Sequence, residues 1–467
     1  MKEKIKRLMR IPGVDKEEQN RLYQNTVNIA LPAAAEGALM AVISAVDTMM
    51  VGALGPAAIA AVGLTAQPRM IMLVMAQALC VGTTAIVARR KGEGDDEGAR
   101  RCLSQSMALM TLIGLAITVL GIVFARPLMA LSGANDETLD MSATYYAIVA
   151  ASFLPNCWQL CICAAFRAIG KTKLTFTTHL LSNLTNVCLN YLLIGGKLGF
   201  PRLGVAGAAL ATSIGTFVAG MAALAFALRP SCYFRYKPFK RTRFDKGTMR
   251  GLFTIGLASM SESVFLRAGF WMLQKIVADL GTNAFASYQI VSQVTSLSFT
   301  VGDGIAAAGV AMVGQSLGAG KPQEADAYVC ASRKVGYVAS GALMTLLIVS
   351  SGTLPHLFTD HPAVIDAARL SFMVVVLGII PHNGRVIYAG CLRGAGDVKY
   401  VAVCSFIGVA VLRPLLAWIF CYPLHNALPA LRLVETGPWW AYVCDAYVRD
   451  ALLTVRIRRG AWKQIRL

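Results

Sequence analysis

Two acidic residues interrupt a stretch that is otherwise apolar between Ile29 and Gly52. This stretch is long enough to cross the hydrocarbon of a bilayer, which takes about 20 residues. Glu36 and Asp47 are separated by about three helical turns, so they lie on about the same side of a helix, roughly 16 Å from one another. An acidic residue at the centre of a spanning helix costs about 2.5–3.5 kcal/mol on insertion scales, and such residues mark ion or proton pathways. Asp47 is therefore the first candidate for an ion-coupling group, and Glu36 is a candidate for lining the same cavity.

A stripe of asparagines marks another apolar run, which covers residues 174–196. Asn183, Asn186 and Asn190 are spaced at i, i+3 and i+7, so they share one face of a helix. Amides within a membrane need hydrogen-bond partners, and polar residues in a helix bundle often only hold the helices together. This structural role stays open beside a functional one, both for the stripe and for Glu36.

The composition indicates a polytopic membrane protein. Of the 467 residues, 56% are hydrophobic and 15% are charged, and the mean hydropathy is +0.57, whereas about a quarter of the residues of soluble proteins are charged. The net charge of +19 comes from short basic clusters between apolar runs, which the orientation rule for membrane loops explains better than a nucleic-acid partner does. Because the first 25 residues are polar, we expect no cleavable signal peptide before the first run. The 12 cysteines have no metal-ligand spacing, and we interpret them as small hydrophobic residues.

The apolar runs predict twelve transmembrane helices. They cover residues 28–54, 58–89, 103–131, 141–168, 174–196, 204–228, 251–280, 284–318, 332–357, 364–392, 399–421 and 435–455. Basic clusters lie at the N-terminus, in alternate loops and in the C-terminal tail, whereas the intervening loops carry acids. Because Lys and Arg concentrate on the cytoplasmic side, we expect a multi-pass protein of the cytoplasmic (inner) membrane with both termini in the cytoplasm.

An internal repeat relates the two halves of the chain. A shift of 226 residues without a gap places Glu36 on Glu262 and Arg167 on Arg393, and it also matches short motifs elsewhere. Each copy holds six predicted spans, an even number, so both enter the bilayer in the same orientation, and a site is expected between or within the halves. We expect an N-terminal six-helix lobe over 1–228, a cytoplasmic connector over 229–250 and a C-terminal six-helix lobe over 251–467.

The second repeat lacks the main acidic candidate of the first. Leu273 occupies the position equivalent to Asp47, so we expect ion coupling in the first lobe. Glu262, Arg267 and Gln289 are candidates for lining a cavity in the second lobe. Because Glu262 and Arg267 are about 140° apart around a helix, each needs a partner from another helix, and a structural ion-pair role is as open as a functional one.

Seven motifs occur in order along nearly the whole chain. They are Val46-Asp-Thr-Met-Met-Val-Gly-Ala-Leu-Gly, Ala60-Ala-Val-Gly-Leu, Val87-Ala-Arg-Arg-Lys-Gly, Arg167-Ala-Ile-Gly-Lys-Thr, Gly204-Val-Ala-Gly-Ala-Ala-Leu-Ala-Thr, Val313-Gly-Gln-Ser-Leu-Gly-Ala-Gly and Leu392-Arg-Gly-Ala-Gly-Asp. Together they resemble the multidrug and toxic compound extrusion (MATE) transporters, particularly the prokaryotic branch. The resemblance implies an all-α, V-shaped bundle with six helices in each of two lobes. It also implies antiport, in which cationic or amphipathic organic compounds leave in exchange for inward H⁺ or Na⁺.

The same resemblance implies a first-lobe cation site. In the family this site combines the Asp of the first span with a pair of polar residues on the fifth helix and a Thr on the sixth, which correspond here to Asp47, Asn186, Asn190 and Thr212. Some members carry an acid where Asn190 stands, so its absence favours protonation of Asp47 over tight Na⁺ binding. We expect no cofactor besides the coupling ion and no metal beyond Na⁺ at Asp47. The expected partners are small organic cations and membrane lipids, and the expected state is a monomer.

Other functional classes are weighed by the motifs that they need. The chain has no His-Glu-x-x-His and no Gly-x-Ser-x-Gly, and its one lookalike of a phosphate-binding loop, Gly314 to Pro322, has the wrong spacing. An enzyme or an ATP-driven pump is therefore not expected. The main alternative is a lipid-linked sugar or lipid flippase of related architecture. A passive channel would be recognised because it cannot accumulate substrate against a gradient.

Overall fold

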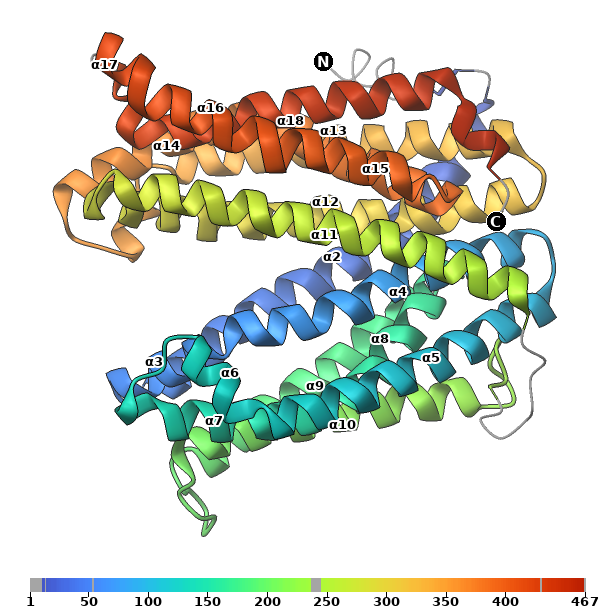
Figure 1. Cartoon of the computed structure of the whole chain (residues 1–467). Helices are drawn as coiled ribbons and strands as arrows, with labels where there is room; N and C mark the ends of the chain where they lie inside the picture. Colours follow the sequence, from blue (N-terminus) through green and yellow to red (C-terminus); the bar gives the residue numbers. More distant parts are fainter. Residues whose placement is uncertain (1–10, 13, 53, 237–244, 429–430, 466–467) are drawn as a thin grey trace. The chain divides into compact units, whose positions relative to one another are not determined.

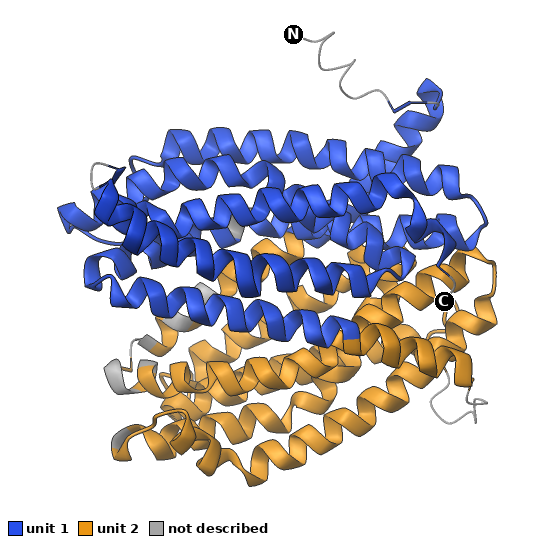
Figure 2. Cartoon of the chain, turned by 45° about the horizontal axis from the view of Figure 1, so that its top comes forward, with its two compact units in different colours: residues 1–34, 258–467 blue, residues 35–257 orange. Residues whose placement is uncertain are grey.

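The computed structural model describes residues 11–12, 14–52, 54–236, 245–428 and 431–465, and these residues form helices and connecting turns without any strand. Residues 1–34 and 258–467 form one compact unit, unit 1, and residues 35–257 form another, unit 2 (Figure 2). The first long helix, α2 (Lys16–Gly52), passes from one unit to the other two residues after Pro32. Proline has no N–H to donate to the preceding turn, so this is a weak point of the helix. The lobe boundaries expected from the repeat stay a prediction.

Unit 2 contains the end of α2, the helices α3 to α10 and the first part of α11 (Lys246–Asp279) (Figure 1). The complete helices are α3 (Pro56–Leu64), α4 (Ala66–Gly92), α5 (Asp96–Val123), α6 (Ala125–Leu131), α7 (Asp136–Ala151), α8 (Phe153–Ala168), α9 (Thr172–Leu193) and α10 (Gly204–Leu228). In this unit α9 packs along α10, and both α4 and α5 pack against α8. Gly215 of α10 lies so close to α9 that an added Cβ would stand 2.8 Å from the carbonyl oxygen of Ser182. Small residues allow helix backbones to approach closely in membranes, and this one brings the polar stripes of α9 and α10 together.

Unit 1 is built around α12 and α14, which pack along one another and against α13 (Figure 1). Its helices are most of α11 (Lys246–Asp279), then α12 (Thr282–Gly318), α13 (Pro322–Ser350), η1 (Pro355–Leu357), α14 (Pro362–Ala395), α15 (Val398–Ser405), η2 (Phe406–Leu412), α16 (Arg413–Ile419), η3 (Phe420–Leu424), α17 (His425–Ala427), α18 (Leu433–Arg459) and η5 (Ala461–Gln464). The first part of α2 joins this core, since Leu22 and Ile29 are buried in the same apolar cluster as Ile305 and Ile387.

Each of the twelve predicted runs is largely helical in its described residues, and short turns interrupt or end several of them. By length and apolar composition, seven helices of the described part could cross a membrane, or eight if the pair Thr138–Ala151 and Phe153–Ala168, bent by 47°, forms a single span. The runs that fall outside this set coincide with α9, α11, α13 and α18. These helices carry the asparagine stripe and several buried charges, which lower their hydropathy.

The eleventh predicted span, over 399–421, is a helix with two wider π-helical turns, η2 and η3. Pro414 is the second residue after η2, and Pro423 lies in η3. Because proline cannot donate the usual hydrogen bond to the fourth preceding residue, the backbone bonding shifts at both places. An added Cβ at Gly269 of α11 would overlap the carbonyl group of Val409 in η2, so α11 and η2 are in backbone contact.

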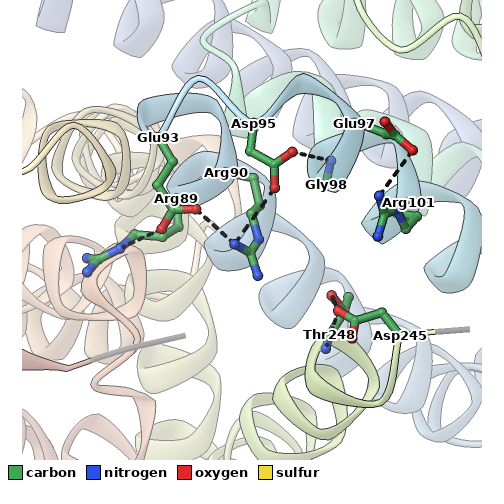
Figure 3. A network of polar contacts seen from close by, with 9 residues as sticks. All are labelled: Arg89, Arg90, Glu93, Asp95, Glu97, Gly98, Arg101, Asp245 and Thr248. Atoms are coloured by element: carbon green, nitrogen blue, oxygen red, sulfur yellow. Dashed lines mark hydrogen bonds and ion pairs between the residues drawn. The ribbon is translucent and has the colours of Figure 1, made fainter.

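The turn between α4 and α5 is fixed by charged side chains (Figure 3). Glu93 accepts from Arg90 at 2.9 Å and lies 3.7 Å from Arg89, both in the last turn of α4. Asp95 caps α5 by accepting from the Gly98 N–H at 2.7 Å. Basic residues at the end of a helix and a carboxylate at the start both favour the helix dipole, which explains the basic cluster at this position without a binding partner.

Candidate functional site

The carboxylate of Asp47, near the end of α2, is held by amides from α9. Asn190 donates to Asp47 Oδ1 at 2.7 Å. In the amide orientation that satisfies both its ends, Asn186 donates to Asp47 Oδ1 at 2.7 Å and Oδ2 at 3.2 Å. Its oxygen then accepts from the hydroxyl and the backbone N–H of Thr212 on α10, both at 3.2 Å. Asn186 and Asn190 are buried, at 6% and 1% exposed. Three helices of unit 2 therefore converge on one acid.

A cavity of about 580 Å³ within unit 2 opens onto this network. Its lining includes all four residues of the predicted cation site and Asn183 of the same stripe. Apolar side chains such as Met40 and Leu73 form much of the remaining wall. A largely apolar cavity of this size with a few convergent polar groups has the usual character of a small-molecule site.

No basic side chain of the described residues forms an ion pair with Asp47. Arg69 of α4 lines the same cavity, but its guanidinium donates to the hydroxyl of Tyr145 at 3.4 Å. Asp47 is half-buried and faces the cavity with amide partners alone. Its carboxylate is therefore available to a cation or a proton that enters from the cavity.

Glu36 occupies a different environment from Asp47, although both belong to α2. Glu36 is 7% exposed and accepts from Arg167 of α8 at 3.1 Å, and His179 Nε2 of α9 lies 3.3 Å away. Glu36 is absent from the lining of the 580 Å³ cavity, whereas His179 belongs to it. Gln159 of the same lining lies 3.4 Å from His179 Nδ1. Glu36 thus reaches the cavity wall only through His179.

The second repeat carries the same polar cluster at the equivalent positions. Glu262 is 4% exposed and accepts from Arg393 of α14 at 2.7 Å and from Ser405 of α15 at 3.0 Å. The shift of 226 residues places Glu36 on Glu262, Arg167 on Arg393 and His179 on Ser405. The repeat therefore preserves a buried carboxylate that ties three helices together in each unit, which is the structural role left open above.

The remaining candidates of the second lobe lie apart from one another. Glu262 lines a cavity of about 420 Å³ within unit 1. Arg267 is half-buried on α11 and Gln289 is exposed on α12, and neither belongs to the lining of that cavity. As the spacing predicts, Glu262 takes its arginine partner from another helix and not from Arg267.

Sequence reasoning missed several residues of the unit 2 site. Arg69 stands alone in an apolar run, which is itself a signal for a charge facing a cavity. Gln77, Asn156 and Gln159 also line the cavity, but single amides in separate helices share no spacing that would group them. Only the packing of α4, α8 and α9 brings them to one wall.

Comparison with known proteins shows the family of this chain. The MatE family model matches residues 32–192 and 258–419, one segment in each repeat. The chain is 27% identical to an uncharacterized transporter, YisQ, of Bacillus subtilis over 90% of each chain. It is 25% identical to a probable multidrug resistance protein, NorM, of Thermotoga maritima over 96% of this chain and 95% of that one. It is 26% identical to the multidrug resistance protein PmpM of Pseudomonas aeruginosa over 90% and 88%.

The fold agrees with solved structures over nearly the full length. The chain superposes with a TM-score of 0.86 on the outward-facing conformation of a multidrug resistance MATE family transporter of the MOP superfamily. This match has 20% sequence identity and covers 94% of this chain and 96% of that one. The predicted all-α architecture of twelve helices in two six-helix repeats is thereby confirmed. The chain belongs to the MatE family and is a multi-pass membrane transporter, not an enzyme.

Proposed function

We propose that this protein exports cationic or amphipathic organic compounds in exchange for protons, with Asp47 as the residue that binds either cargo. Relatives with similarity over most of the chain are named multidrug resistance proteins, which supports organic compounds as substrates. The observation that carries the proposal is the pairing of the Asp47 carboxylate with amides and with no basic group of the described residues, at the wall of a 580 Å³ cavity.

The chemistry of exchange follows from the partners of Asp47. An ionised carboxylate accepts hydrogen bonds from Asn186 and Asn190 and attracts a cation in the cavity. Protonation removes that charge, so the carboxyl no longer holds the cation, which is released. The protein with a neutral site can then change from the outward-open to the inward-open state. No unpaired charge has to stay in a medium of low dielectric constant, where it would cost much free energy. Loss of the proton on the other side of the membrane restores the cation site. Each cargo shifts the equilibrium between the outward-open and inward-open states by the difference in its affinity for them.

The amide geometry favours protons over sodium as the coupling ion. In the orientation given above, both amide groups present N–H donors to Asp47. Na⁺ needs oxygen ligands, so Asn186 and Asn190 would have to rotate to coordinate it. The site also supplies a single carboxylate, because Asn190 stands where an acid would add a second one.

We further propose that the protein works as a monomer in the cytoplasmic membrane with both termini in the cytoplasm. The basic turn between α4 and α5 supports this orientation. Cysteines placed singly in the loops of a variant that is otherwise free of cysteine, labelled with an impermeant thiol reagent in whole cells, test the topology. Labelling of residues in the loop between α4 and α5 from outside the cell would contradict it.

The function is tested with purified protein in proteoliposomes and ethidium as the transported dye. Proton and sodium gradients are imposed separately, and dye movement against its own gradient is followed. Wild type should respond to the proton gradient, and Asp47→Asn should lose this response while inserting normally. Asp140→Asn is the matched control, because Asp140 forms an exposed ion pair with Arg126 on the surface of the same unit. A wild-type rate in Asp47→Asn would refute the assignment, and a response to sodium alone would refute proton coupling.

A further inference from the structure

The 420 Å³ cavity of unit 1 has no part in the proposed export of cations. Its most frequent charged residue is arginine: Arg385 and Arg393 of α14, Arg413 of α16 and Arg449 of α18 all line it. The cavity lies wholly within unit 1 and is separate from the cavity at Asp47.

The carboxylates in and beside this cavity are fewer than the arginines that line it. Glu262 binds Arg393, and Asp445, which is 0% exposed, is shared by Arg413 and Arg449. Asp303, the other acid of the lining, forms no ion pair with a described residue. Four guanidinium groups therefore face three carboxylates, and the region keeps one positive charge.

Among the four arginines of the lining, Arg385 is the one that forms no ion pair with a described carboxylate. Its Nη2 lies 3.1 Å from Nδ1 of His382, and its buried Nε has no hydrogen-bond partner there. The Tyr442 hydroxyl and Trp439 Nε1, both of α18, are likewise buried without hydrogen-bond partners among the described residues. Both residues line the cavity. These residues are only 4% and 5% exposed. Arg and Trp nitrogens can only donate, so the cavity offers hydrogen-bond donors that lack acceptors.

The repeat shows that the unit 1 cavity has arginines at positions where unit 2 has uncharged residues. Leu273 lines the unit 1 cavity at the position equivalent to Asp47, so the acid is absent. Arg385 occupies the position equivalent to Gln159, which lines the unit 2 cavity. Arg413 likewise replaces Val187. Two cavities at equivalent places in the repeat thus differ in charge: the unit 2 lining has one acid and one arginine, whereas the unit 1 lining has four arginines and two acids among aromatic rings.

The rest of the wall suits a flat apolar body. Phe270, Phe299 and Tyr288 line the cavity beside Trp439 and Tyr442. Phe299 is stacked on the His382 ring with centroids 3.5 Å apart and 10° between the planes. A volume of about 420 Å³ is in the range of small-molecule pockets and is too small for the two acyl chains of a phospholipid. We propose that this cavity is a binding site for a small aromatic carboxylate, with the carboxylate on Arg385, Tyr442 and Trp439 and the ring among the aromatic side chains.

The test measures equilibrium binding of 2-naphthoate to the full chain in lipid nanodiscs, by titration calorimetry. Wild type should bind 2-naphthoate and should bind 2-naphthamide, the neutral analogue, at least about tenfold more weakly, because hydrogen bonds to a charged acceptor are the stronger ones. Arg385→Gln, which introduces the residue found at the equivalent position of unit 2, should weaken naphthoate binding at least about tenfold. Arg385→Lys keeps the charge and should bind with an intermediate affinity.

Tyr442→Phe removes one donor without changing the shape of the side chain, and it should weaken naphthoate binding severalfold. Asp47→Asn is the control for the other cavity and should bind naphthoate as wild type does, even where it no longer exports ethidium. Absence of naphthoate binding to wild type would overturn the proposal. So would equal affinity for the amide, wild-type affinity in Arg385→Gln, or loss of binding in Asp47→Asn. Competition by phosphatidylglycerol added to the nanodiscs would assign the cavity to a lipid headgroup and would overturn it as well.

Discussion

Replacement of Asp445 by Asn should destabilise unit 1 strongly. Asp445 is 0% exposed, and its two guanidinium partners, Arg413 and Arg449, are 3% and 2% exposed. Arg413 Nε donates to Asp445 Oδ2 at 3.0 Å and Arg449 Nε donates to Oδ1 at 2.7 Å. The Asn side chain would accept at one atom only, and two buried positive charges would face one another without a counter-charge.

The expected loss follows from the burial of all three groups. Breaking a buried ion pair by removing one partner costs about 3–5 kcal/mol, because the remaining charge stays buried. For a unit of this size each kcal/mol shifts the melting temperature by roughly 2–4 °C, so the midpoint should fall by about 6–20 °C. Arg413 begins α16 directly after the first π-helical turn, η2, so this part of unit 1 should open first.

The assay is thermal unfolding in detergent, followed by the monodisperse fraction on size exclusion after heating. Asp366→Asn is the matched control, since Asp366 pairs with Arg432 where both side chains are about half exposed. An exposed pair contributes about 0–1 kcal/mol, so the control should melt close to wild type. A triple variant with Met, Leu and Leu at Arg413, Asp445 and Arg449 should recover most of the loss, as apolar replacement of buried charges does elsewhere. Equal melting of Asp445→Asn and wild type would refute this reasoning.

Three further predictions concern other parts of the chain. Asn190→Ala removes a hydrogen bond of 2.7 Å to Asp47, and because such bonds to charged groups contribute about 1.5–3 kcal/mol, ethidium export should fall about tenfold or more; unchanged export would argue against the contact. Glu36→Gln and Glu262→Gln should lower the melting temperature by similar amounts, since each leaves one buried arginine interaction unmatched, and a large difference between them would contradict the equivalence of the two clusters. Asp245 accepts hydrogen bonds from the first turn of α11, which lower the pKa of its carboxyl below the usual 3.8. The stability that these bonds add is present above pH 3.8 and is lost as the pH falls through the lowered pKa. Asp245→Ala should remove this acid sensitivity, which melting curves between neutral and acid pH would measure.

The positions of the spans could be read from the sequence, and so could the polar residues that interrupt them. The spacing of Asn186 and Asn190 places them on one helix face, and the acid in the first apolar run needs polar partners. The resemblance supplied the grouping of Asp47 with Asn186, Asn190 and Thr212 into one site. The structure brings these residues together because α9 and α10 approach closely at Gly215, a contact that no local pattern predicts.

The arginine partner of Glu36 could have been found from the repeat alone. Glu36 and Arg167 recur as Glu262 and Arg393 at one offset, and a carboxylate and an arginine that are preserved together are good candidates for an ion pair. The mixed charges of the unit 1 cavity were not predictable in this way. Arg385 lies in a run without helical periodicity of polar residues, and its position in a cavity depends on the packing of α12, α14 and α18.

Proton release on substrate binding tests the exchange at Asp47 most directly. Purified protein in weakly buffered detergent solution is mixed with ethidium, and the proton concentration is followed with an indicator dye. At a pH where the site is partly protonated, wild type should release protons as ethidium binds, since both compete for one carboxylate, and Asp47→Asn should release none. Equal proton release from Asp47→Asn and wild type would contradict the account, because the proton and the organic cation would then meet at another residue.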